Sequence, residues 1–379
     1  MRTIEQDWVE KYELPVTFAG QIAVPPSEVL EVRQIRRTDP STQYALISAR
    51  EAWEDSGLDE VDGERLGVAV SSGIGGIWTI LDAWDTIKER GARRVLPMTI
   101  PMLMPNAPAA NISVEYGAKA GAHAPVSACA SGAEAIGDAV EMIRNGRADV
   151  VLAGGTEAPI HPMPIASFAK MQALSTRNDD PAGASRPYDV TRDGFVMGEG
   201  AGVIVLESLE HAQARGARIY AEIVGVGMTA DAYDVAPPDP SGQGQERAMR
   251  AAATDAGIDP ASVVHVNAHG TSTPAGDLVE AQAIARVCGN DTIVTATKSM
   301  TGHLLGGAGA LETIFTILAV HERQVPPTIN ITEPEPELSV DVARDTARAL
   351  PAEGELVAIN NAFGFGGHNV ALAVKTYQE

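Results

Sequence analysis

One cysteine of this chain stands where an expected buried strand gives way to a helix. The run from Val126 to Ala135 reads VSACASGAEA, in which Cys129 is followed by small residues and a helical pattern that continues to about Arg144. Unpaired N–H groups and the positive end of the helix dipole favour a thiolate over a thiol at such a position. The position therefore predicts a nucleophile. A free cysteine is more often a small buried core residue, and the turn alone does not decide between the two roles.

Two histidines follow other expected strands. His269 opens the polar run HGTSTPAGD, directly after an apolar strand expected over 263–267. His303 closes the run KSMTGH, which follows a strand expected over 293–296. A Cys/His pair suits acyl transfer. A second histidine is useful where an enolate oxygen must also be stabilised, so with Cys129 these side chains form a candidate Cys/His/His set.

Strand and helix patterns alternate along the chain, which predicts an α/β fold. Further strands are expected over 67–72, 149–153, 200–209, 219–227 and 357–361, and further helices over 40–56, 246–257 and 307–321. The segment 96–108 is rich in Pro and Met and is expected to be irregular. A reactive residue beside a strand-to-helix turn occurs in both halves, which indicates a duplicated fold.

Composition excludes several functional classes. The length of 379 residues suits two units or one duplicated unit. A net charge of −22 argues against binding to nucleic acid or to an anionic membrane surface. Cys129 and Cys288 have no metal-ligand spacing and build no disulfide framework, so a reducing cytoplasm is expected. The sequence has no signal peptide and no apolar run long enough for a membrane helix.

The polar runs resemble those of the β-ketoacyl-[acyl-carrier-protein] synthases, and the type II elongating enzymes of fatty-acid synthesis most closely. Four motifs carry the resemblance in the family order, namely SAC at 127–129, HGTSTPAGD at 269–277, KSMTGH at 298–303 and GFGG at 364–367. The resemblance implies a thiolase-like fold in five layers, α-β-α-β-α, and a homodimer. It divides the chain into two pseudo-symmetric halves, 1–214 and 215–379.

The resemblance also implies an activity. A cytoplasmic acyltransferase of this family moves an acyl chain from acyl carrier protein to Cys129, decarboxylates malonyl-[acyl-carrier-protein], and joins the two as a 3-oxoacyl-[acyl-carrier-protein]. His269 and His303 are then neutral imidazoles that donate hydrogen bonds to the forming enolate. Backbone N–H groups of Cys129 and Phe365 hold the oxyanion of acyl transfer. Phe365 is the gate between acyl pocket and malonyl site, and no cofactor is needed beyond the carrier's phosphopantetheine.

The remaining implied residues surround this set. Lys298, Asp277, Glu280 and Glu312 form a charged support for the histidines, Thr271 and Thr273 bind the pantetheine arm, and Ile74 and Phe168 line the acyl pocket. Docking of the acidic carrier protein is expected at Arg33, Arg36, Arg37, Arg93 and Arg94. Surface arginines are otherwise commonly just solvated. His368 stands where many members carry Thr, which bears on substrate preference.

Other classes fit less well. A degradative thiolase needs a second catalytic cysteine near the C-terminus, where this chain has GFGG, and the starting synthases use Cys-His-Asn. A non-catalytic chain-length partner lacks the nucleophile. A ketosynthase of polyketide assembly stays open as the alternative, because it shares every catalytic residue.

The start of the chain carries a further expectation. Family members usually open with an apolar strand, a Gly-rich turn and a helix before the stretch that resembles Met1 to Ile4. We expect that strand to lie inside a sheet, where its absence leaves N–H and C=O groups unpaired. On this hypothesis Met1 is a misplaced start and a longer form is more stable.

Overall fold

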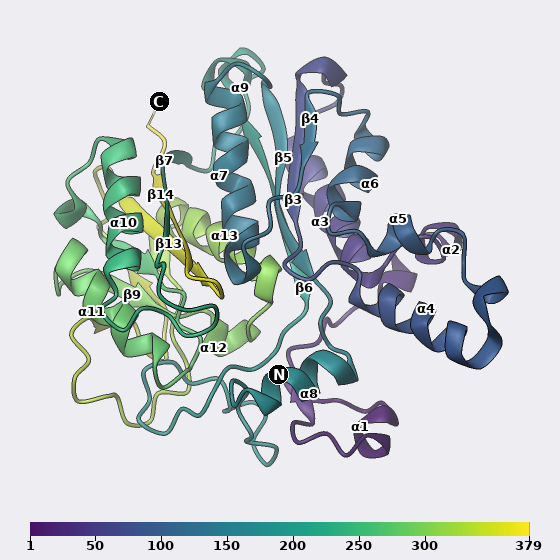
Figure 1. Ribbon diagram of the computed structural model, residues 1–379. Helices are drawn as coiled ribbons and strands as arrows, with labels where there is room; N and C mark the ends of the chain where they lie inside the picture. The colour runs from purple at the N-terminus through teal and green to yellow at the C-terminus, as the bar shows by residue number, and fades with distance from the viewer. Residues whose placement is uncertain (379) are drawn as a thin grey trace.

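The computed structural model describes residues 1–378 and builds them around two β-sheets (Figure 1). The first sheet has the order β4 (Gly121–His123), β3 (Leu66–Ser71), β5 (Val150–Glu157) and β6 (Gly200–Glu207). The second has the order β11 (Asp341–Val342), β9 (Ile293–Thr295), β8 (His265–Asn267), β13 (Val357–Gly364), β14 (His368–Lys375) and β7 (Glu222–Ala230).

The two sheets share one plan. In the first, β3 runs parallel to β4 and β5, and β5 pairs antiparallel with β6. In the second, β8 runs parallel to β9 and β13, and β13 pairs antiparallel with β14. The predicted internal duplication is therefore present in the strand pairing.

The duplication is incomplete at one edge. β14 also pairs antiparallel with β7, whereas within residues 1–378 no strand pairs with the outer edge of β6. A cavity of about 700 Å³ lies along this edge, lined by β6 and by residues of the helices beside it, among them Ala52, Ile314 and Leu318.

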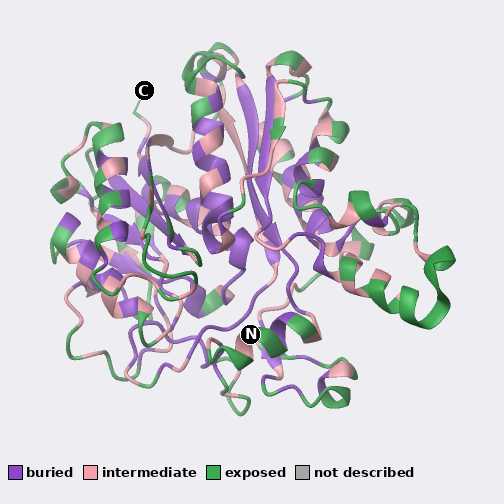
Figure 2. Cartoon of the chain, viewed as in Figure 1, coloured by how far each residue is buried: buried purple, intermediate pink, exposed green. Residues whose placement is uncertain are grey.

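Helices complete five layers. α3 (Pro40–Ser56) and α6 (Ala107–Tyr116) pack on one face of the first sheet. α7 (Ser131–Arg144) and α13 (Ala308–His321) lie between the sheets, and α10 (Gln243–Ala256) and α11 (Gly276–Cys288) cover the outer face of the second (Figure 1). The buried residues follow these layers (Figure 2).

Small residues allow the central layer to fit between two sheets. A Cβ atom on Gly132 of α7 would lie 2.7 Å from the Gly306 carbonyl oxygen, and one on Gly309 of α13 would lie 2.9 Å from the Ala133 Cβ. Such approaches leave no room for a larger side chain. This packing accounts for a core rich in alanine and valine, in a chain with only 4% aromatic residues.

The remaining helices and strands lie outside the two main sheets and the helices already described. They are β1 (Arg2–Thr3), α1 (Trp8–Lys11), β2 (Phe18–Ala19), α2 (Val32–Ile35), α4 (Ile77–Arg90), α5 (Thr99–Leu103), α8 (Pro162–Lys170), α9 (Leu209–Ala214), α12 (Lys298–Thr301), β10 (Gln324–Val325) and β12 (Arg348–Ala349). Six 3-10 turns complete them: η1 (Pro26–Glu28), η2 (Gly63–Arg65), η3 (Ala92–Arg94), η4 (Ala128–Ala130), η5 (Pro260–Ser262) and η6 (Leu305–Gly307). Among residues 1–378, no helix has the length and apolar character needed to span a bilayer.

Most expected elements are confirmed to within a few residues. Asp39 caps the helix that Pro40 opens, by accepting from the Ser41 N–H, and Gly57 ends it with φ of 66°. The expectation of an irregular segment over 96–108 is wrong in part, because α5 and the start of α6 lie there. Pro108 sits in the first turn of α6, where its missing N–H breaks no helical bond.

Candidate active site

The cysteine turn is held in a strained backbone conformation. Cys129 lies in η4, directly before α7, and Ala128 has φ of 51°, in the left-handed region that non-glycine residues rarely adopt. The Ser131 hydroxyl accepts from the Ser127 N–H at 3.0 Å and donates to the Ala128 carbonyl at 2.7 Å. These hydrogen bonds close the turn and place Cys129 at the N-terminus of α7.

Burial decides the protonation state of Cys129 in the free protein. Burial raises the pKa of its thiol to about 12, although the Lys298 cation and the backbone N–H groups of Phe365 and Cys129 lower it. The expectation of a resting thiolate is therefore wrong. The helix end does not offset the cost of placing an anion in a site with an exposed fraction of 9%.

Two backbone N–H groups lie close to the cysteine thiol. The N–H groups of Phe365 and Cys129 both lower its pKa. Gly364 allows this approach, because a Cβ atom there would lie 2.4 Å from the Ser127 carbonyl oxygen. The N–H groups predicted to hold an oxyanion are therefore brought close to Cys129 by a turn that only glycine fits.

The two histidines face each other beside a hydrophobic cluster. The ring centroids of His269 and His303 are 5.3 Å apart, and the Phe195 ring meets His303 edge-on at 5.3 Å. Burial lowers the pKa of both imidazoles well below the usual value, and the Lys298 cation lowers them further. Both rings are therefore neutral at physiological pH, as expected for hydrogen-bond donors.

A buried ion pair supports His269. Lys298 Nζ donates to Glu312 Oε1 at 2.5 Å and to the His269 carbonyl at 2.6 Å. It also lies 3.4 Å from His269 Nδ1, so that ring nitrogen is the acceptor and Nε2 carries the proton. Burial raises the pKa of the Glu312 carboxyl to about 7, and Lys298 opposes this shift.

Two more carboxylates hold the loop that begins at His269. Glu280 accepts from the N–H groups of His269 and Gly270, at 2.8 Å each. Asp277 accepts from the N–H groups of Ser272 and Thr273, at 3.1 and 3.3 Å. Thus all four charged residues predicted as support contact this loop or one another.

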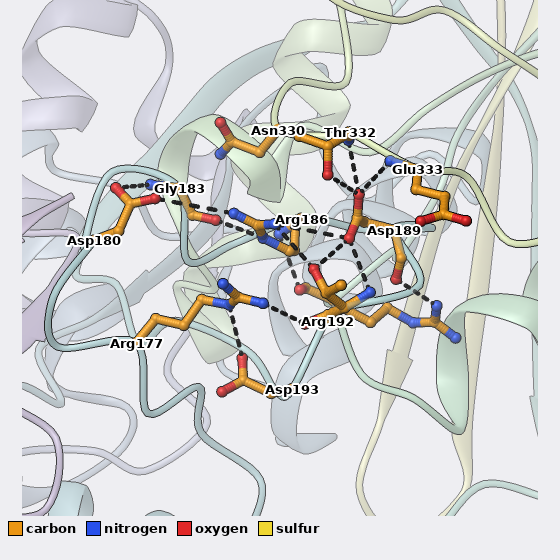
Figure 3. Close-up of polar contacts among 12 residues, drawn as sticks. Arg177, Asp180, Gly183, Arg186, Asp189, Arg192, Asp193, Asn330, Thr332 and Glu333 are labelled. Carbon is orange, nitrogen blue, oxygen red and sulfur yellow. Dashed lines mark hydrogen bonds and ion pairs between the residues drawn. The ribbon is translucent and has the colours of Figure 1, made fainter.

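Two charged residues that the sequence analysis did not single out extend this support. Arg192 lies 3.4 Å from Asp277 and donates to the carbonyl groups of Thr273 and Pro274 at 3.0 Å. Asp189 anchors the segment that carries Arg192 to residues 332–333, by accepting from both the N–H and the hydroxyl of Thr332 (Figure 3). The dense charge in RPYDVTRDG, residues 186–194, was the available signal.

The expected pocket and pantetheine residues lie near the cysteine and the loop. Ile74 and Phe168 belong to the hydrophobic cluster that contains Cys129, and the Phe168 ring centroid is 6.2 Å from that of Phe365. Phe365 is 36% exposed, so it borders solvent as well as the cluster. The hydroxyls of Thr271 and Thr273 lie 3.1 Å apart on the partly exposed side of their loop.

The five arginines expected to dock a partner lie on the surface, away from these residues. Arg33 is on α2, Arg36 and Arg37 follow it, and Arg93 and Arg94 end η3. All five are exposed, and none forms an ion pair within the described part of the chain. His368, at the start of β14, is exposed too.

Known proteins are similar to this chain in sequence. The chain is 45% identical to a 3-oxoacyl-[acyl-carrier-protein] synthase 2 of Synechocystis sp., over 95% of this chain and 88% of that protein. It is 48% identical to the Staphylococcus aureus protein of the same name, over 92% of this chain and 84% of the relative.

Solved structures agree in fold. A beta-ketoacyl synthase from Burkholderia phymatum superposes with a TM-score of 0.91 at 37% identity, covering all of this chain and 92% of that one. A ketosynthase solved with its type II polyketide acyl-carrier protein gives 0.91 at 32% identity and the same coverage. The fold is therefore the thiolase-like ketosynthase fold. Residues 2–212 match the family description "Beta-ketoacyl synthase, N-terminal domain" and residues 220–332 match "Beta-ketoacyl synthase, C-terminal domain", so the chain belongs to the beta-ketoacyl synthase family.

Proposed function

We propose that this protein elongates fatty-acyl chains by condensing an acyl group with malonyl-[acyl-carrier-protein]. The observation that carries the proposal is the packing of the Gly364 backbone against the Cys129 turn, beside two buried imidazoles whose ring centroids are 5.3 Å apart. The N–H groups of Cys129 and Phe365 suit the oxyanion of acyl transfer. The imidazoles suit the enolate formed by decarboxylation.

The first step is transfer of the acyl group. The Cys129 sulfur attacks the carbonyl carbon of an acyl thioester, the thiol proton leaves the sulfur, and the phosphopantetheine thiol departs with a proton. The N–H groups of Cys129 and Phe365 stabilise the tetrahedral oxyanion, and each such donor contributes about 3–4 kcal/mol. Ile74 and Phe168 contact the acyl chain.

The second step is carbon–carbon bond formation. The C–C bond to the malonyl carboxylate breaks, carbon dioxide leaves, and its electron pair passes into an enolate. His269 and His303 donate hydrogen bonds to the enolate oxygen. The enolate carbon then attacks the acyl-cysteine carbonyl, and the Cys129 thiolate departs and takes up a proton to regenerate the thiol. Each step is acyl transfer or decarboxylation, so the carrier's phosphopantetheine is the one prosthetic group that the proposal requires.

The assignment to fatty-acid elongation is supported by the names of the two curated relatives, at 45% and 48% identity. A polyketide ketosynthase is the alternative, because one similar structure is bound to a polyketide carrier protein. Incubation with acyl- and malonyl-carrier protein of fatty-acid synthesis tests the proposal by mass spectrometry of the product. A 3-oxoacyl-carrier protein two carbons longer than the acyl donor is expected. Turnover with polyketide carriers alone would contradict the assignment.

The partners belong to the same proposal. The acyl carrier protein docks at the five exposed arginines, which offer local positive charge on a chain of net charge −22. The protein acts as a homodimer in the cytoplasm, with a division into halves at residues 214 and 215. Sedimentation equilibrium at micromolar concentration tests the dimer, and a monomer that retains full activity would contradict it.

A further inference from the structure

Another buried carboxylate lies beside Cys129, apart from those that hold the histidine loop. Glu157 ends β5, with an exposed fraction of 1%. Its Oε2 atom accepts from the N–H groups of Gly73 and Gly306, at 2.9 Å each. Its Oε1 atom accepts from the Ser72 hydroxyl at 2.6 Å and from the Ile74 N–H at 3.3 Å.

These donors come from two turns that touch the cysteine turn. A Cβ atom on Gly73 would lie 2.9 Å from the Ala128 carbonyl oxygen, and one on Gly306 would lie 2.3 Å from the Gly73 nitrogen. Glu157 thus joins the turn that follows β3, which carries Ile74, to η6. The Gly73 backbone at this junction rests directly on the residue before Cys129.

Two residues of the junction are strained. Ala128 precedes Cys129 with φ of 51°, and Leu305 precedes Gly306 with φ of 47°. A non-glycine residue in the left-handed region is strained and persists only where its surroundings hold it in place. Glu157 supplies such a hold by binding Gly306 directly and by keeping Gly73 against the Ala128 carbonyl.

We propose that Glu157 is a positioning residue for the acylation step. It fixes the Cys129 turn and the Ile74 wall of the acyl pocket relative to each other. The inference rests on the proposed function and adds to it a residue for one half of the reaction. The charge of Glu157 does not itself activate the cysteine, because a nearby carboxylate raises the pKa of the thiol. Its role is geometric.

The variant Glu157→Gln tests the inference. An amide NH₂ group replaces one carboxylate oxygen, and because it cannot accept hydrogen bonds it is left opposite N–H or O–H donors. We expect acyl transfer from acyl-carrier protein to Cys129 to slow by about 10- to 100-fold, because a small misplacement of reacting groups costs about that much in rate. Decarboxylation of malonyl-carrier protein, measured with Cys129→Ala in both backgrounds, should change less than about twofold, because Glu280 holds the histidine loop. A merely structural defect would lower both rates.

Two controls accompany this variant. Glu199→Gln removes a largely buried carboxylate that lies before β6 and accepts from the Tyr44 hydroxyl at 2.9 Å, and it should acylate as the wild type does. Ser72→Ala removes one of the four donors and should slow acylation by about fivefold, the effect of one ordinary hydrogen bond.

The outcomes separate the two proposals. Wild-type acylation in Glu157→Gln, or an equal loss of acylation and decarboxylation, would overturn the positioning role. If Glu157→Gln does not fold, the variants Ser72→Ala and Gly306→Ala test the positioning role instead. Normal acylation in both would overturn that role. A wild-type protein that accepts no acyl group from carrier protein would overturn the proposed function instead.

Discussion

The Lys298 ammonium group and the Glu312 carboxylate form an ion pair at 2.5 Å in which both side chains are almost completely buried. The same ammonium donates to the His269 carbonyl, so this pair is part of the support of a proposed catalytic residue. Removing one member of a buried ion pair leaves the charge of the other member buried and uncompensated.

Lys298→Met should therefore lower the free energy of unfolding by about 3–5 kcal/mol at pH 8. A carboxyl whose pKa is raised on folding, as burial raises that of Glu312 to about 7, loses its stabilising contribution as the pH rises through that value. The loss should therefore be smaller at pH 5. Chemical denaturation at both pH values measures it. The double variant Lys298→Met/Glu312→Leu should recover most of the stability, and a single variant as stable as the wild type would contradict the prediction.

Cys129→Ala should abolish condensation, because no acyl-enzyme can form without the sulfur. Decarboxylation of malonyl-carrier protein should persist in part, since His269 and His303 remain in place. Release of carbon dioxide and formation of 3-oxoacyl product, followed separately, measure the two reactions. Condensation at the wild-type rate would exclude Cys129 as the nucleophile.

His303→Ala should lose decarboxylation by about 10²- to 10³-fold, the usual effect of removing one oxyanion donor. Acylation of Cys129 should continue, because its proposed donors are the N–H groups of Cys129 and Phe365. Mass spectrometry after incubation with acyl-carrier protein detects the acyl-enzyme. A variant that cannot be acylated would show that this division of roles is wrong.

Alkylation of Cys129 by iodoacetamide should accelerate steadily from pH 7 to pH 10 without a plateau. Burial raises the pKa of this thiol to about 12, so the reactive thiolate fraction grows about tenfold per pH unit over that range. Cys288, whose thiol pKa is also raised to about 12 by burial, is distinguished by peptide mapping. A plateau near neutral pH would indicate a resting thiolate.

Replacing Arg36, Arg37, Arg93 and Arg94 by Glu should raise the KM for carrier-linked substrates more than the KM for small thioesters. These side chains are exposed, so the change should act through charge on an acidic partner and should weaken at high salt. Steady-state kinetics at two salt concentrations, with both substrate types, measure the effect. The same increase for both substrates would remove the docking argument.

The sequence by itself determined the residue types and the elements that carry them. The proposed nucleophile Cys129, the histidines of two polar runs and the GFGG turn lie in short contiguous motifs, and strand and helix periodicities surround them. Such signals depend on neighbours a few residues away, so they are readable without a structure. The segment 96–108 is the exception to this agreement. Its prolines suggested an irregular segment, but a proline is permitted in the first turn of a helix.

Only the tertiary structure decided what surrounds those motifs. Glu157 binds Gly73 and Gly306, which lie far from it in sequence, and Arg192 reaches Asp277 across 85 positions of the chain. The protonation of Cys129 likewise follows from desolvation by residues of several elements, which outweighs the local effect of a helix end. Burial and long-range hydrogen bonds are sums over the folded neighbourhood, and no local pattern encodes them.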